Sequence, residues 1–344
     1  MYFVQPESKK RRGNGKWTLL GEGTKFVPPD VPFVAQEKIN ATLPQNATAV
    51  DYLKLYFTDE MVDFMVLETN KYAEQFISSN PIKPHSRVNN WVSTDRDEML
   101  AFLGLAILMG VVYKPRIQLY WSTDAIYHTD IFPSVMARDR FLLILHFLHF
   151  ADNSTFNASD PKRDRLWKIR PFIQMIRDRC QQVYTPGQDL CVDESLLLFK
   201  GRLAFKQFIK SKRARFGIKL FELCTKRGVL LDLIVYTGDM SKELVDLEGF
   251  QISERIPMTL MKPYLGQGYR LFIDNFYTSP HLAEFFLQNR TTLVGTVRPN
   301  RRNFCAELVT ADISRGESKF AMSDKGLSRY RIELLIYTLK IAQL

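Results

Sequence analysis

The sequence contains few cysteines, no long hydrophobic run and none of the common P-loop, HExxH or GxGxxG motifs. Its four cysteines lie far apart, so no CxxC pair is available for a zinc ribbon or a redox centre. Scattered cysteines in a chain of 344 residues favour a reducing compartment over a disulfide scaffold. The longest uncharged apolar stretch, residues 99–113, is shorter than the ~18 residues of a membrane span. It predicts a buried helix and no membrane partner.

The composition is that of a globular protein with a basic surplus. Hydrophobic residues make up 46% of the chain and aromatic residues 12%, which excludes wholesale disorder. The 47 basic residues outnumber the 37 acidic ones, giving a net charge of +10. This surplus favours a polyanionic partner, of which nucleic acid is the commonest.

The pattern along the chain predicts four regions. Residues 1–50 form a flexible basic tail, whose run Lys9–Arg12 is typical of a nuclear import signal, a phosphate-binding arm or a solvated charge cluster. Residues 51–188 carry helical periodicity and form a helical dimerisation or DNA-binding domain. Residues 189–298 form an α/β core, and residues 299–344 begin an insertion region and end in an atypical apolar tail from residue 328.

Five apolar runs predict the strands of the core, at residues 190–199, 216–224, 229–236, 269–274 and 292–297. The first three are expected to form a meander. Ser279 and Pro280 cap a helix that runs to about residue 289, between the last two strands. A strand, a helix and a strand form a parallel unit, so the core is expected to be a mixed five-stranded sheet with helices.

Carboxylates interrupt or end two of these apolar strands. Asp193 and Glu194 interrupt the first, and Asp274 ends the fourth. Two carboxylates from different strands of one sheet form a hard-oxygen site suited to Mg²⁺. Glu194 is a poor third ligand because side chains alternate faces along a strand. The alternative is that each Asp caps a turn or a helix. His146 and His149, three residues apart on an apolar helix, are expected to be core or interface residues and not metal ligands.

A basic segment lies between these strands. Residues 200–219 contain eight basic residues and no acidic residue, with three phenylalanines interleaved. Such a segment suits phosphate neutralisation and base stacking, although a solvated loop is the alternative. A second acid-free basic group follows the fifth strand. The candidate DNA-binding residues are Lys200, Arg202, Lys206, Lys210, Lys212, Arg213, Arg215, Lys219, Arg298, Arg301 and Arg302.

Several short strings, in this order and spacing, resemble the piggyBac-type transposases and their domesticated derivatives. They are YTPG at 184–187, VDES at 192–195, FKGR at 199–202, RFGIK at 215–219, LGQGY at 265–269, DNFYTS at 274–279 and VGTVR at 294–298. The resemblance extends from about residue 50 to residue 325.

The resemblance implies a fold and a chemistry. The family has an RNase H-like catalytic core, preceded here by the helical domain, and uses Asp residues on the first and fourth strands to hold two divalent metal ions. Asp193 and Asp274, 81 residues apart, fall on those positions. The implied cofactor is Mg²⁺ or Mn²⁺, and the implied reaction is DNA strand cleavage and transfer at TTAA sites. A nuclear protein with DNA and a second copy of the chain as partners is expected.

The family also uses a third Asp, beyond an insertion domain, and no residue up to Leu344 matches it. We therefore expect a C-terminally truncated, transposase-derived DNA-binding protein that is inactive as this chain. The alternatives are an active transposase completed by a further segment or another chain, and a defective gene product.

Overall fold

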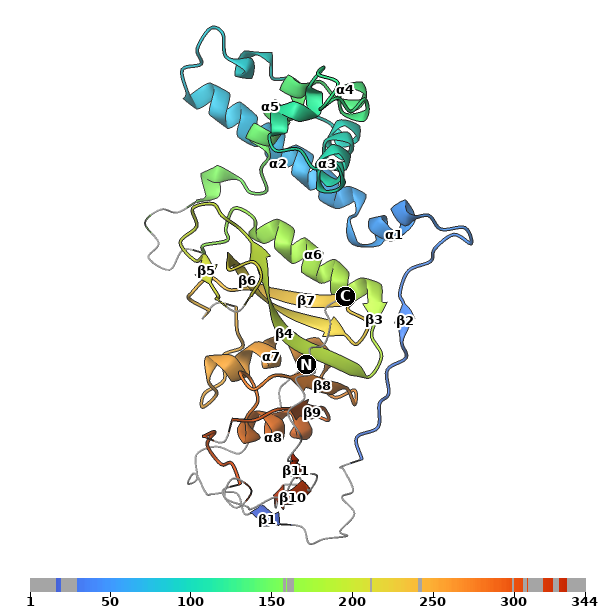
Figure 1. Cartoon of the computed structure of the whole chain (residues 1–344), viewed down its shortest axis with the longest axis vertical. Coiled ribbons are helices and arrows are strands. Elements are labelled where there is room, and N and C mark those ends of the chain that lie inside the picture. The colour runs from blue at the N-terminus through green and yellow to red at the C-terminus, as the bar shows by residue number, and fades with distance from the viewer. Residues whose placement is uncertain are drawn as a thin grey trace. The chain divides into compact units, whose positions relative to one another are not determined.

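The computed structural model describes residues 17–19, 30–156, 159, 164–210, 212–240, 243–298, 300–305, 308, 318–323 and 328–332. The chain divides into two compact units (Figure 1): the sheet unit, residues 1–38 and 184–344, and the helical unit, residues 39–183. The run Lys9–Arg12 lies outside the described residues. The division differs from the expected boundaries at residues 50 and 188, because residues that the sequence places in the tail pack with the sheet unit. The backbone amide of Val34, for example, donates to the carbonyl of Gln267 at 3.0 Å.

The sheet unit is built on a six-stranded mixed sheet in which β5, β6, β4, β8 and β9 follow one another and β7 pairs with β6. The predicted meander is antiparallel, and β8 and β9 are parallel to β4. The strands are β4 (Asp189–Leu198), β5 (Gln207–Phe208), β6 (Phe216–Thr225), β7 (Leu230–Val235), β8 (Arg270–Ile273) and β9 (Thr292–Gly295). The expected mixed sheet is confirmed, with β5 as an additional short edge strand.

Two helices accompany this sheet. α8 (Pro280–Gln288) begins as predicted, because the Ser279 side chain accepts a hydrogen bond from the Leu282 amide at 3.0 Å. The sequence does not predict α7 (Ile252–Met261), which contains Pro257 and continues into the short helix η4 (Lys262–Tyr264). Apolar side chains from both helices and the central strands form one core, in which Val192, Leu271 and Phe285 are fully buried. This core packs against β4 and β8 and so holds in place the two strands that lead to Asp193 and Asp274.

Shorter strands complete the described part of the sheet unit. β1 (Trp17–Leu19), β10 (Ser318–Ser323) and β11 (Ser328–Ile332) form an antiparallel sheet. β11 contains the first five residues of the apolar tail that begins at residue 328. β2 (Lys38–Ile39) and β3 (Tyr184–Thr185) form a two-stranded sheet.

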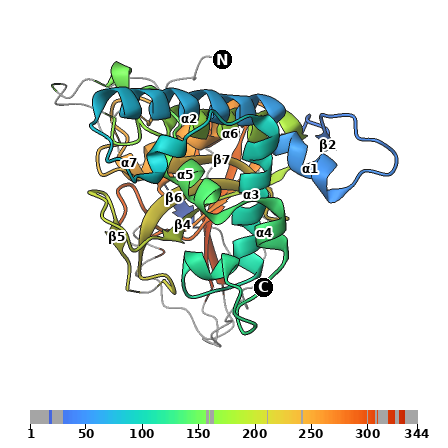
Figure 2. The ribbon, with the colours of Figure 1, turned by 90° about the horizontal axis from the view of Figure 1, so that it is seen from above.

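The helical unit confirms the periodicity read from residues 51–188 (Figure 2). Its helices are α1 (Ala49–Tyr56), α2 (Asp59–Ser79), α3 (Arg96–Val111), α4 (Ile131–Val135), α5 (Arg138–Phe147) and α6 (Arg170–Val183), with short 3₁₀ turns η1 (Arg87–Asn90), η2 (Ile117–Trp121) and η3 (Asn153–Thr155). The helical periodicity at residues 51–80 corresponds to two helices, α1 and α2. A new helix begins after Thr58, because the Thr58 side chain caps α2 by accepting a hydrogen bond from the Met61 amide at 3.4 Å.

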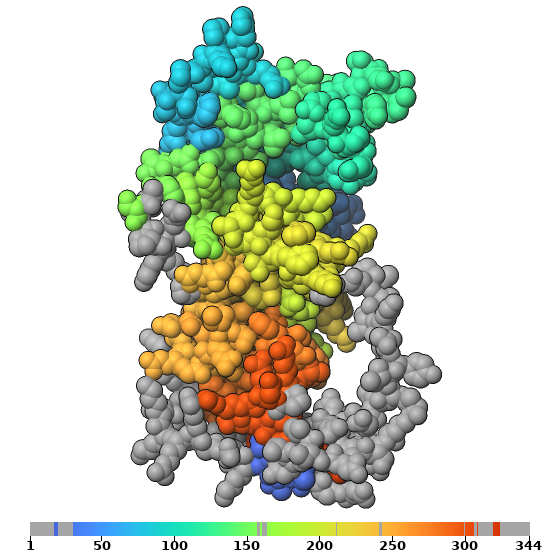
Figure 3. Space-filling model, turned by 60° about the vertical axis from the view of Figure 1, so that its left-hand side comes forward, coloured from blue at the N-terminus to red at the C-terminus, as the bar shows by residue number. Residues whose placement is uncertain are grey.

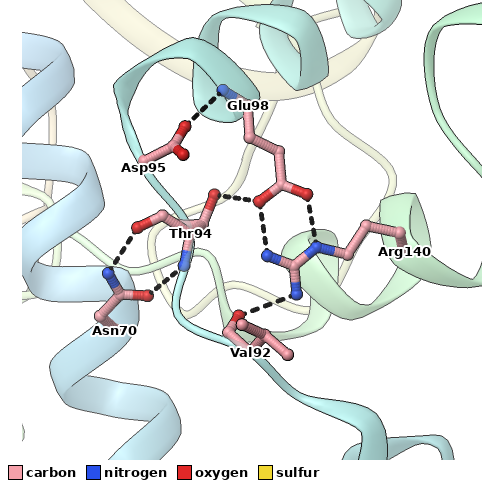
Figure 4. Close-up of polar contacts among 6 residues, drawn as sticks. All are labelled: Asn70, Val92, Thr94, Asp95, Glu98 and Arg140. Atoms are coloured by element: carbon pink, nitrogen blue, oxygen red, sulfur yellow. Dashed lines mark hydrogen bonds and ion pairs between the residues drawn. The ribbon is translucent and has the colours of Figure 1, made fainter.

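A polar network ties α2, α3 and α5 together (Figure 4). Asn70 exchanges two 2.8 Å hydrogen bonds with the backbone of Thr94, whose hydroxyl donates to Glu98 at 2.6 Å. Arg140 donates to Glu98 at 2.6 Å and to the Val92 carbonyl at 2.9 Å. Hydrogen bonding to Arg140 lowers the pKa of Glu98 below its usual value. The network therefore holds a carboxylate in its charged form between three helices.

The apolar stretch at 99–113 is buried on one side only. Met99, Phe102 and Leu105 of α3 are buried, whereas Ile107 and Val111 are 64% and 80% exposed. The expectation of a buried helix is therefore correct for one face of α3. None of the described helices has the length and apolarity needed to cross a membrane.

The two histidines pack against aromatic rings. The His149 ring stacks on Tyr72 at 4.0 Å, and the His146 ring meets Phe76 edge-on at 5.5 Å. His149 is buried, as the apolar surroundings in the sequence predict, whereas His146 is exposed.

Candidate active site

Asp193 and Asp274 each directly follow the last residue of their strand that is paired in the parallel ladder between β4 and β8. The last paired residues are Val192 and Ile273. Asp193 lies in the middle of β4, which continues to Leu198, and Asp274 is the first residue after β8. Residues in register on parallel strands point to the same face. Both aspartates are exposed, so neither carries the cost of a buried unpaired charge.

Each of these carboxylates accepts one local backbone hydrogen bond. Oδ1 of Asp193 accepts from the Glu194 amide, and Oδ1 of Asp274 accepts from the Phe276 amide, both at 2.8 Å. Asp274 thus caps the turn that follows β8, whereas Asp193 lies inside β4 and caps no turn, and the cap of α8 is Ser279. Within the described residues, the Oδ2 atoms of the two aspartates have no hydrogen-bond partner.

The phenol of Tyr277 interacts electrostatically with the acidic residues of this region. The residue is fully buried, and its hydroxyl has no hydrogen-bond partner among the described residues. Burial raises the pKa of Tyr277 far above its ordinary value, and the negative charges of Glu194, Asp193 and Asp274 raise it further. The three carboxylates thus place a negative field on one buried phenol. Tyr277 stands three residues after Asp274 in the sequence, but a single tyrosine there gives no sign of its burial.

The other two acidic residues near this end of the sheet have separate partners. Glu194 is in register with the buried Phe221, on the face opposite to Asp193, and lies 3.7 Å from the Lys212 ammonium. Glu222 faces Asp193 across β4 and β6 and accepts from the Ser195 hydroxyl at 2.9 Å. No group of three or more His, Cys, Asp or Glu residues that could hold a metal occurs in the part of the chain that the structure describes.

Two exposed carboxylates that follow adjacent paired residues are hard oxygen donors, the type that Mg²⁺ and Mn²⁺ take. A metal ion held by this pair stays a prediction from the sequence. The described residues supply two such donors, and the other donors would be water or substrate oxygens.

Most of the cations in the basic segment are exposed. It forms the connection from β4 to β6, at the surface coloured yellow in Figure 3. Five of its cations are exposed and take part in no ion pair within the described ranges: Lys200, Arg202, Lys210, Arg213 and Arg215. Phe208 and Phe216, 57% and 49% exposed, pack against each other at 4.7 Å. Exposed cations beside exposed aromatic rings suit a polyanion with stacking faces.

The remaining three cations of the segment have contacts within the protein. Lys206 donates to the Gly201 carbonyl at 2.9 Å, and Lys212 donates to the Glu194 carbonyl at 3.2 Å. The Lys219 ammonium lies 4.7 Å and 5.2 Å from the ring centres of Phe221 and Phe276. Lys219 therefore places a positive charge next to the turn that follows Asp274.

The second basic group divides in the same way. Arg298 and Arg301 donate hydrogen bonds to the turn after Asp274, whereas Arg302 is exposed. The sequence indicates charge at these positions but gives no sign of the contact with the turn.

An antiparallel meander is followed by two parallel strands, and an acidic residue lies within β4 and directly after β8. This order is that of an RNase H-like fold. The family model described as Transposase IS4 matches residues 48–333. PiggyBac transposable element-derived protein 2 of Homo sapiens is 30% identical over 308 residues, which cover 88% of this chain and 49% of that protein. PiggyBac transposable element-derived protein 3 of Homo sapiens is 28% identical, over 73% of this chain and 40% of that protein.

A solved structure also matches. The cryo-EM structure of a piggyBac transposase synaptic complex with hairpin DNA aligns with a TM-score of 0.64 and 28% identity, covering 80% of this chain and 59% of that chain. The chain described here belongs to the piggyBac-type transposase family. It spans about half the length or less of these curated relatives.

Proposed function

We propose that this chain is a transposase-derived DNA-binding protein whose exposed basic segment holds DNA next to the Asp193–Asp274 pair. The observation that carries the proposal is the register of β4 and β8, in which Val192 pairs with Ile273 and each aspartate is the next residue along the chain. The basic segment continues from the strand that contains Asp193, because it begins at Lys200, two residues after β4 ends at Leu198. The solved relative is a complex with hairpin DNA, which supports DNA as the substrate class.

The two carboxylates would provide two ligands of a divalent metal ion. An ion held there would supply Lewis-acid activation of an attacking oxygen and charge stabilisation of a leaving one in phosphodiester cleavage. Phosphate binding by the basic segment would hold the DNA backbone near this pair. TTAA recognition, a nuclear location and pairing with a second copy of the chain belong to the same proposal, because they are what the family resemblance implies.

We propose further that residues 1–344 alone do not cleave DNA, because the described residues bring two carboxylates and not three to the site. Incubation with TTAA-flanked transposon-end DNA and Mn²⁺ tests this. The expected result is intact DNA. Nicking that disappears in Asp193→Ala would instead establish an active transposase whose remaining ligand comes from elsewhere.

DNA binding is tested by its dependence on salt. Replacing Arg213 and Arg215 by Ala should reduce the slope of log affinity against log salt by about two units, roughly 0.9 for each lost phosphate contact. The matched control removes the same charge at the other end of β6, where Lys226 and Arg227 are exposed. Equal slopes for the two double variants would show that the basic segment has no special role in DNA binding.

A further inference from the structure

Two arginines after β9 hold the turn that carries Asp274. Nη2 of Arg301 donates to the carbonyls of Asn275 and Phe276 at 3.1 Å and 2.5 Å. Nε of Arg298 donates to the Asn275 side-chain oxygen at 3.0 Å. Charged donors make the stronger class of hydrogen bond, and the two arginines make three such bonds to two consecutive residues.

This turn sets the position of Asp274. Asp274 is the first residue after the last paired residue of β8, so no strand partner fixes it. Its Oδ1 accepts from the Phe276 amide, and its carbonyl accepts from the Thr278 amide at 3.2 Å and the Thr278 hydroxyl at 2.6 Å. Any movement of residues 275–278 therefore moves the Asp274 carboxylate relative to Asp193.

The end of β9 lies unusually close to this turn. A Cβ atom at Gly295 would come within 2.4 Å of the Ile273 carbonyl oxygen and 2.6 Å of the Thr278 hydroxyl oxygen. Glycine allows this approach because it has no side chain. The approach brings the following segment, with Arg298 and Arg301, against the turn.

We propose that Arg301, assisted by Arg298, is a positioning residue that keeps Asp274 in register with Asp193. Arg301 acts through the backbone of the turn and not by contact with DNA or metal. This agrees with its partial burial, whereas its neighbour Arg302 is exposed. The proposal rests on the proposed function, in that the position of Asp274 matters for a metal ion held by both aspartates.

The chain contains a matched pair for the test. Arg301→Gln and Arg302→Gln remove the same charge one residue apart, and only the first removes the hydrogen bonds to the turn. Titration of the full chain with Mn²⁺, followed by electron paramagnetic resonance of the free ion, gives the metal affinity. We expect Arg301→Gln to weaken Mn²⁺ binding by about ten-fold or more, as loss of residues that orient metal ligands does. Arg302→Gln should leave Mn²⁺ affinity unchanged, and Arg301→Lys should recover part of the loss.

Amide hydrogen exchange provides a second readout that does not depend on metal. The amides of Phe276 and Thr278 both donate to Asp274, so Arg301→Gln should speed their exchange and Arg302→Gln should not. Should Arg301→Gln fail to fold, Arg301→Lys is compared with Arg302→Gln in its place.

The outcomes separate the two proposals. Equal Mn²⁺ affinity and equal amide exchange in the Arg301 and Arg302 variants would overturn the positioning role, and an equal loss of DNA salt dependence in both would identify them as phosphate contacts. Absence of Mn²⁺ binding by the unmodified chain would contradict the metal site of the proposed function. The exchange rates would still decide whether Arg301 holds the turn.

Discussion

Asp193 and Asp274 are 81 residues apart in the sequence, and each directly follows the last pair in register between β4 and β8, Val192 with Ile273. The pairing of β4 with β8 sets where each aspartate leaves the ladder, and the turn after Asp274 sets the position of its carboxylate. What holds their exact orientation is local: one amide hydrogen bond to each carboxylate, and the turn after Asp274.

The close approach of β9 to that turn predicts a sensitive glycine. Gly295→Ala should lower the free energy of unfolding by about 1–3 kcal/mol, because the new methyl group meets the Ile273 carbonyl and the Thr278 hydroxyl. Urea unfolding measures the change. The control is Val294→Ala, an exposed neighbour on the same strand, and an equally small effect of both changes would argue against the close approach.

Removing the buried hydroxyl of Tyr277 should change the free energy of unfolding in the opposite direction. Tyr277→Phe removes a hydroxyl that has no hydrogen-bond partner among the described residues, so the free energy of unfolding should stay the same or rise by about 1 kcal/mol. A clear loss of stability in the same urea experiment would mean that the hydroxyl is hydrogen-bonded in solution.

The network in the helical unit predicts a dependence of stability on pH. The lowered pKa of Glu98 means that the charged form is favoured in the folded state. Its contribution is present above the ordinary glutamate pKa and is lost as the pH falls through the lower folded value. Thermal unfolding of the unmodified chain should therefore show a stability loss below about pH 4.5 that is smaller in Glu98→Gln.

The same variant should be less stable at neutral pH. Glu98→Gln weakens the hydrogen bonds to Arg140 and should cost about 1–3 kcal/mol at pH 7. Glu74→Gln, an exposed residue of α2, is the control. An identical pH profile for both variants would remove Glu98 from the account.

The sequence predicts the sheet and its two aspartates because both leave local signals. The apolar runs of β4 and β8 end at or are interrupted by carboxylates, and Ser279 followed by Pro280 marks the start of α8. Proline inside a helix is unfavourable, so Pro257 argues against a helix at this place in the sequence although α7 forms there.

Contacts between distant segments leave no such signal. The packing of Phe33 on Tyr269, with ring centres 5.0 Å apart, joins residues 236 positions apart in the sequence. The hydrogen bonds of Arg301 to the turn after Asp274 are equally invisible, because a basic residue near a predicted DNA site is first interpreted as a phosphate contact. Only the folded chain distinguishes Arg301 from Arg302.

The most direct test of the account is a double-mutant cycle on Mn²⁺ affinity with Asp193→Asn and Asp274→Asn, with Asp246→Asn as an exposed control on the same unit. If the two aspartates hold one ion, each single variant removes most of the binding, the double variant loses little more, and the control binds like the unmodified chain. Independent, additive effects of the two substitutions, or unchanged binding in either single variant, would contradict a shared metal site.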